Sequence, residues 1–157
     1  VWFQHAILED LLCEPLRICP AVETIWSKAF VMERERYDGA DVAHLFLHCA
    51  KDLDWQRLLD RFGPHWRLLL SHIVLFGFIY PGERSRIPEW VVESLLQNLR
   101  EESALAAAEK TCQGTLVSRE QYLIDLERGY QDARLGPKGN LTKEEADQWT
   151  AAIGKDK

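Results

Sequence analysis

The segment that decides the fold reads ETIWSKAFVMERERYDGAD and spans residues 23–41. Apolar residues recur in its first half at the spacing of one helix face, which predicts an amphipathic helix over residues 21–36. Gly39 interrupts this pattern, and a second helix is expected over about residues 40–50. Two helices joined by a short, strongly charged bend are therefore the organising element of the chain.

Five charged side chains are expected to meet at this bend. Lys28 lies two turns before the end of the first predicted helix, and Arg34 and Arg36 occupy its last turn. Asp38 and Asp41 stand at the N-cap and N3 positions of the second helix. Helix capping and the helix dipole account for four of these charges. Lys28 is not needed for capping, and it favours the other interpretation, a site that binds an anionic ligand.

The charged positions from Lys28 to Asp41 follow the pattern K-x5-R-x-R-x-D-x-x-D. This pattern resembles the helix pair that follows the catalytic sheet in bacterial nucleotidyltransferase-like proteins, a group akin to the abortive-infection nucleotidyltransferase toxins. Three longer runs resemble one branch of that group and together cover most of the chain: RICPAVETIWSKAFVMERERYDGADVAHL, DWQRLLDRFGPHWRLLLSHIVLFGFIYPGER and GTLVSREQYLIDLERGYQDAR. The first two runs are the specific ones.

In this family the active site precedes the region that matches. A Gly-Gly or Gly-Ser turn, an Asp-x-Asp strand and a third aspartate hold Mg²⁺ against a nucleoside triphosphate. No such segment precedes Val1, and the chain begins without a methionine in the aromatic-rich run VWFQHAIL. The resemblance therefore implies the C-terminal part of a longer nucleotidyltransferase, with no catalytic residue or metal site in this chain. The full-length protein would use Mg²⁺ and the triphosphate, whereas this chain alone is expected to be inactive.

The resemblance also implies roles for the charged residues of the bend. Lys28 would neutralise the triphosphate, while Arg34 and Arg36 would orient phosphate or brace the bend. Asp38 and Asp41 would hold these cations in place before the chemistry. A second interpretation stays open, in which the helices form a non-catalytic interaction or regulatory module and the charged bend is purely structural.

The sequence predicts a mainly α protein, in which a helical bundle follows a short N-terminal β-hairpin. Residues 1–19 show two short apolar runs around a turn, and in the family they would be the end of the nucleotidyltransferase α/β sheet. Residues 20–110 are assigned to the helical domain, and residues 111–157 to a C-terminal helical tail packed on it. Further helices are expected over residues 54–61, 65–79 and 88–100, and capping-box patterns stand at 118–121 and 142–145. Four tryptophans are expected in the core: Trp26, Trp55, Trp66 and Trp90.

Two other pairs of residues imitate metal sites. Asp52 and Asp54 are two apart, as on a metal-binding strand, but helical spacing follows them, so Asp54 is expected to cap a helix. His44 and His48 have metal-ligand spacing, yet no third ligand stands nearby. No metal site is therefore assigned to this chain. His72, on an apolar helix, is expected to be partly buried and hydrogen-bonded.

Arg84 and Arg86 form a second candidate site for phosphate. They follow Gly82 in a polar loop, where a glycine lets the backbone approach a ligand closely. Guanidinium groups bind phosphate through paired hydrogen bonds, although solvated loop charges are commoner.

Composition sets the outer bounds. With 157 residues and a net charge of −6, the chain is large enough for one core, and its acidity argues against a broad nucleic-acid surface. The apolar run at residues 68–80 is shorter than the roughly 20 residues that a bilayer requires, so no membrane span is expected. Four cysteines, Cys13, Cys19, Cys49 and Cys112, are read as buried thiols of a cytoplasmic protein. Unpaired edge strands would favour a homodimer through the N-terminal strands.

Overall fold

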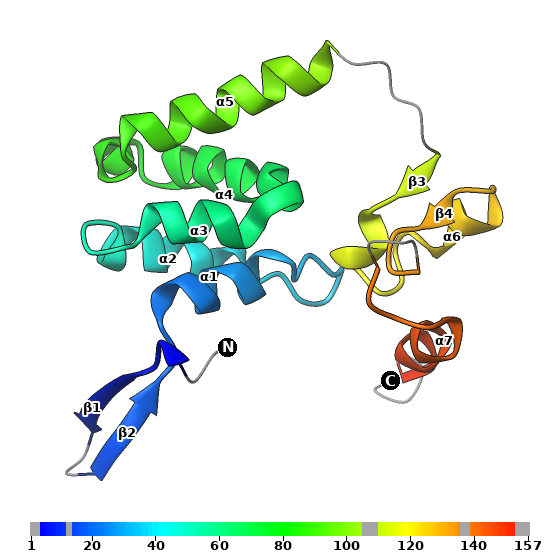
Figure 1. Ribbon diagram of the computed structural model, residues 1–157, viewed down its shortest axis with the longest axis horizontal. Helices are drawn as coiled ribbons and strands as arrows, with labels where there is room; N and C mark the ends of the chain where they lie inside the picture. Colours follow the sequence, from blue (N-terminus) through cyan, green and yellow to red (C-terminus); the bar gives the residue numbers. More distant parts are fainter. Residues whose placement is uncertain (1–3, 12–13, 105–109, 136–138, 153–157) are drawn as a thin grey trace. The chain divides into compact units, whose positions relative to one another are not determined.

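The computed structural model describes residues 4–11, 14–104, 110–135 and 139–152 (Figure 1). The chain divides into two compact units. The first unit comprises residues 1–29 and 38–105, and the second comprises residues 30–37 and 106–157. The described part is mainly helical with a two-stranded antiparallel hairpin near its N-terminus, which confirms the predicted fold class.

The hairpin consists of β1 (Ile7–Leu11) and β2 (Glu14–Ile18), which pair antiparallel. Ile7 lies opposite Ile18, and Glu9 lies opposite Leu16. Because opposed residues share a face and successive residues alternate, Ile7, Leu16 and Ile18 lie on the same face of the hairpin, together with Glu9. The three apolar side chains are exposed. Residues 12 and 13, at the predicted turn, lie outside the described residues, and the homodimer through these strands stays a prediction.

Five helices build the core of the first unit: α1 (Ala21–Ala29), α2 (Gly39–Cys49), α3 (Trp55–Phe62), α4 (Trp66–Ile79) and α5 (Glu89–Ser103). Two 3-10 segments, η2 (Gly63–His65) and η3 (Pro81–Arg86), separate the last three helices. Gly63, with a φ of 45°, ends α3 in a conformation that favours glycine. Helices α2 to α5 therefore lie where the sequence predicts them, and the predicted polar loop at Gly82 is part of η3.

Aromatic side chains fill the centre of this bundle. Phe46 on α2 is fully buried and stacks on Trp55, with ring centroids 5.7 Å apart. It also meets Phe76 of α4 edge-on at 5.8 Å. Trp55 and Trp66 are buried as predicted, but Trp90 is 47% exposed, so its predicted core position is wrong. Trp90 stands in the first turn of α5 next to Val91, which is completely buried, so the bundle covers the other side of this turn.

The first helix ends earlier than its periodicity predicts. It stops at Ala29 rather than residue 36, and residues 30–37 belong to the second unit. There the backbone N–H of Met32 donates to the carbonyl of Val117 at 3.0 Å, and Met32 forms an isolated β-bridge with Tyr37. These bonds use backbone groups that a continuing helix would need.

His72 of α4 is buried and marks the end of α1. Its Nε2 lies 3.1 Å from the carbonyl oxygen of Ala29, to which the neutral ring donates a hydrogen bond. The expectation of a buried, hydrogen-bonded histidine is thus confirmed.

We expect this histidine to make the stability of the first unit depend on pH. Burial lowers the pKa of His72 from its usual 6.5, so the folded protein keeps the ring neutral where the unfolded chain takes up a proton. The free energy of unfolding should therefore fall as the pH drops below about 6.5, as urea unfolding measures. His72→Gln keeps a donor for Ala29 but does not titrate, and an equally steep loss in this variant would contradict the assignment.

The second unit is built from short elements. A parallel pair joins β3 (Thr111–Cys112) to β4 (Gln131–Asp132), and η4 (Gly114–Leu116), α6 (Leu123–Glu127) and α7 (Lys143–Ala152) complete it. A Cβ at Gly114 would lie 2.2 Å from the ring of Tyr122, so only glycine fits there. The capping box before α7 is confirmed. The N–H of Glu145 donates to Thr142 Oγ1 at 3.2 Å, and Glu145 accepts from the N–H of Thr142 at 2.8 Å.

Ion pairs link distant parts of the second unit. Arg119 donates two hydrogen bonds to the carboxylate of Glu33, at 2.6 and 2.9 Å, and these bonds lower the pKa of Glu33. Asp132 and Arg134 pair at 2.7 Å with both side chains 7% exposed, and Thr115 Oγ1 donates to the same aspartate at 2.8 Å. These contacts connect residues 30–37 to the C-terminal part of the chain and order the loop around β4.

One stretch of the described chain, Trp55–Ile79, is long and apolar enough to cross a membrane by length and composition. It joins α3, η2 and α4, and only a third of its most apolar window is buried. Phe62, Leu69 and Phe76 are nevertheless completely buried in the bundle, as in a core helix. A single helix of this kind is weak evidence for a membrane span.

The predicted buried thiols are only partly observed. Cys49 and Cys112 are free and half-buried, and Cys13 lies outside the described residues. Cys19 is exposed, so for this residue the prediction is wrong. It stands between β2 and α1, where the hairpin leaves it uncovered.

Candidate functional site

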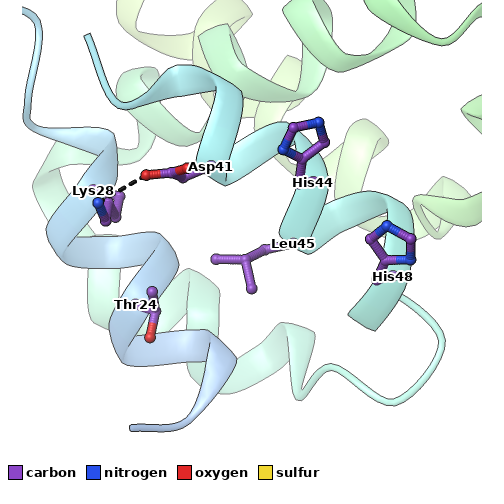
Figure 2. A pocket seen from close by; sticks show the side chains of 6 residues that line it. All are labelled: Thr24, Lys28, Asp41, His44, Leu45 and His48. Carbon is purple, nitrogen blue, oxygen red and sulfur yellow. Dashed lines mark ion pairs between the residues drawn. The ribbon is translucent and has the colours of Figure 1, made fainter. Parts of the chain in front are cut away.

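Lys28 is held between two carboxylates at the N-terminal end of α2. Its Nζ lies 3.0 Å from Asp38 Oδ2 and 2.8 Å from Asp41 Oδ2; Figure 2 shows the pair with Asp41. The last turn of α1 positions the lysine, and the start of α2 positions both aspartates. The structure therefore assembles three of the five charged residues that the sequence singled out.

The electrostatics of this cluster keep the lysine charged. Hydrogen bonds to Asp41 and then to Asp38 raise the pKa of Lys28 from its usual 10.5. The side chain of Lys28 is 31% exposed, whereas those of Asp38 and Asp41 are 10% and 53% exposed. Two carboxylates face one ammonium, so the cluster carries a net negative charge, and Asp41 is the partner that solvent reaches more easily.

Asp38 does not cap α2 with its side chain. It stands at the N-cap position, and its carbonyl oxygen accepts from the N–H groups of Asp41 and Val42. Its carboxylate makes no cap hydrogen bond and accepts from Lys28 instead. The capping role predicted for the Asp38 side chain is thus wrong, whereas Asp54 caps α3 as predicted, accepting from the N–H of Arg57 at 3.0 Å.

A groove of about 340 Å³ lies beside this cluster, between α1 and α2. We call it the α1–α2 groove, and it is lined by Thr24, Lys28, Asp41, His44, Leu45 and His48. Figure 2 shows both histidines projecting from the same helix, as expected for residues four apart. They are exposed. Their spacing is that of metal ligands, although the sequence assigns no metal site to them, and the structure places both in the wall of a groove that also contains a lysine.

The two arginines of the predicted cluster lie in the second unit. Arg34 and Arg36 are exposed residues of the segment 30–37. Glu33 and Arg36 exchange backbone hydrogen bonds, and the charge of Arg36 contributes to the lowered pKa of Glu33. Neither arginine occupies a helical turn, because α1 ends before them. Their assignment to phosphate stays a prediction.

Arg84 and Arg86 both lie on η3 but differ in their partners. Arg84 Nε donates to the carbonyl of Gly77 at 3.0 Å. Arg86 forms an ion pair with Glu83. Arg86 is therefore neutralised by its neighbour, while Arg84 lies across the last turns of α4.

The described residues contain no group of three or more His, Cys, Asp or Glu side chains that could hold a metal ion. Asp52 lies in a turn and Asp54 caps a helix. This part of the chain therefore does not fit the Mg²⁺ site that the resemblance implies for the full-length protein, and none of its residues is given a role in metal chemistry.

Sequence reasoning missed a buried acid on α1. Glu23 is 1% exposed and forms an ion pair with Arg57 of α3, and its Oε2 has no hydrogen-bond partner among the described residues. Arg61, one turn further along α3, places its guanidinium 4.5 Å from the ring centre of Trp26. Arg57 and Arg61 are both half-buried and stand four apart on α3, and this spacing, which places them on one face of the helix, was the available signal.

The fold and the site define a helical domain with an ion-paired lysine on the wall of a groove. No family model, curated protein or solved structure matches the chain. Functional assignment therefore rests on the geometry of the α1–α2 groove and on the pattern of its residues.

Proposed function

We propose that the first unit is the helical part of a nucleotidyltransferase-like protein, and that its α1–α2 groove receives the phosphates of a nucleoside triphosphate. The observation that supports this proposal is the ammonium of Lys28 in the groove wall, whose pKa is raised by its hydrogen bonds to Asp41 and Asp38. His44 and His48 line the same groove, and their ring N–H groups can donate hydrogen bonds. Such groups are the usual partners of phosphate oxygens.

A phosphate would reach Lys28 by replacing one of its carboxylates. Asp41 is the partner more able to turn away, because its side chain is 53% exposed and that of Asp38 only 10%. Asp38 would then keep the lysine in position. In this account both aspartates are positioning residues, and the transfer reaction requires metal-binding carboxylates that the described residues do not supply. The free thiols fit a cytoplasmic protein, and we include that location in the proposal.

Replacing Lys28 with methionine should weaken ATP binding by about tenfold, because the phosphates lose their fixed cation. Asp41→Asn should instead strengthen binding, since it removes the competing charge. Calorimetric titration of the chain with ATP, with and without magnesium, measures both effects. Lys51→Met, an exposed lysine in the turn after α2, is the matched control and should bind as the wild type does. Equal affinities in all four proteins would exclude this groove as the phosphate site.

The non-catalytic module is the second candidate function. Phe78 on α4 is 79% exposed and Val74 is 64% exposed. Such exposure is unusual for an aromatic residue on a helix of a folded domain and favours contact with a partner.

A further inference from the structure

A second groove of the first unit lies where α4, η3 and α5 meet. It has a volume of about 430 Å³ and shares no lining residue with the α1–α2 groove. We call it the α4–α5 groove, and six of its lining residues carry the argument: Ile73, Val74, Phe78, Arg84, Ile87 and Val92. Five of these side chains are apolar, so the groove is suited to apolar side chains of a partner.

The apolar side chains at its edge are left open to solvent. Val74 and Phe78 stand four apart on α4 and therefore share one face of the helix. Their exposed fractions, 64% and 79%, mean that the bundle itself does not use this face. Ile73 and Ile87, in contrast, are buried beneath it. The groove thus has a packed floor and an uncovered apolar rim.

Arg84 is the charged residue of this lining. Its Nε donates to Gly77 O, and its side chain lies in contact range of Gly77, where a Cβ would meet it at 3.5 Å. Among the described residues no carboxylate pairs with it, whereas Arg86 is paired with Glu83 and Arg67 with Glu102. In a chain of net charge −6, the groove therefore presents an apolar surface with one uncompensated positive charge.

We propose that the α4–α5 groove binds an amphipathic helix of a partner protein, with an apolar stripe on the rim and a carboxylate facing Arg84. Helices recognise such grooves through apolar residues at positions i, i+3 or i+4, and i+7. The positive charge of Arg84 decides which partner fits the groove. A second copy of this chain would bring another Arg84 and no acid from the same lining.

The test is a display library of helical peptides of about 16 residues, selected against the purified chain. The proposal expects enrichment of peptides that combine the apolar stripe with Asp or Glu. Phe78→Ser should weaken these peptides by about tenfold or more. Arg84→Gln should remove the preference for the acidic residue while leaving apolar binding in place. Ile124→Ser, a matched exposed apolar residue in the second unit, should bind like the wild type.

Several results would overturn the proposal. Enriched peptides without an acidic preference, or peptides that bind Phe78→Ser unchanged, would show that this groove is not the site. Sedimentation that reveals a dimer abolished by Phe78→Ser would assign the rim to a second copy. Flotation with anionic vesicles that depends on Phe78 would assign it to a membrane. Because Phe78 is exposed, circular dichroism should show Phe78→Ser folded, which keeps these outcomes interpretable.

Discussion

Replacing Phe46 with alanine is expected to lower the free energy of unfolding by about 4 kcal/mol. The ring is completely buried and touches both Trp55 and Phe76. Its removal would therefore lose the hydrophobic free energy of the buried ring and leave a cavity where α2, α3 and α4 meet. Urea unfolding of the chain, followed by tryptophan fluorescence, measures this loss.

Phe78 provides the matched control, because the same residue type stands 79% exposed on α4. Phe78→Ala should change the free energy of unfolding by less than about 0.5 kcal/mol. Phe46→Leu, which keeps most of the buried volume, should lose no more than about 1.5 kcal/mol. Similar losses at positions 46 and 78 would mean that the bundle is not packed around Phe46.

Replacing Glu23 with alanine should cost about 3 kcal/mol, because it leaves the charge of Arg57 without its partner at the α1–α3 interface. Glu23 is 1% exposed and Arg57 is 28% exposed. Water still reaches part of the guanidinium, so the loss should lie toward the lower end of values for a broken buried pair.

The double variant Glu23→Leu with Arg57→Leu separates the contribution of the two charges to the free energy of unfolding from the contribution of packing. If desolvation of the pair offsets its attraction, the double variant should be much more stable than Glu23→Ala. Glu102→Ala breaks the exposed pair with Arg67, whose side chains are 51% and 47% exposed, and should cost less than about 1 kcal/mol. A loss at Glu23 no larger than at Glu102 would contradict the burial of this carboxylate.

Local signals made most of the bundle predictable. Gly63-Pro64 and Tyr80-Pro81-Gly82 interrupt the apolar periodicity at the points where α3 and α4 end. Between such breaks, helical spacing identifies which residues lie inside, as it does for Leu58 and Phe62. The capping box at Thr142 is a local signal of the same kind.

Long-range contacts account for what the sequence could not predict. The helical pattern continues through Met32, but that residue pairs with Val117, 85 positions further along the chain. Glu33 likewise meets Arg119. No local rule anticipates these partners, so the end of α1 and the separate placement of Arg34 and Arg36 were missed. Trp90 was misplaced because helical spacing does not show which side of a helix end is covered.

The candidate site was predictable to the extent that it is local. Lys28, Asp38 and Asp41 lie within two adjacent helices and meet as the pattern predicts. The histidines of the groove were recognised as a pair with a shared face, but their position opposite α1 depends on the packing of α1 against α2. The contact of Glu23 with α3 is a tertiary feature of the same kind.

The central claim is that phosphate oxygens meet Lys28 in the α1–α2 groove. The most direct measurement follows the imidazole NMR signals of the chain as ATP is added. The account predicts that His44 and His48, which line the groove, shift with ATP, that His65 and His72 of the bundle stay fixed, and that Lys28→Met requires about tenfold more ATP for the same shifts. Shifts that follow the same ATP concentrations in that variant as in the wild type, or that appear at His65 and His72 instead, would contradict it.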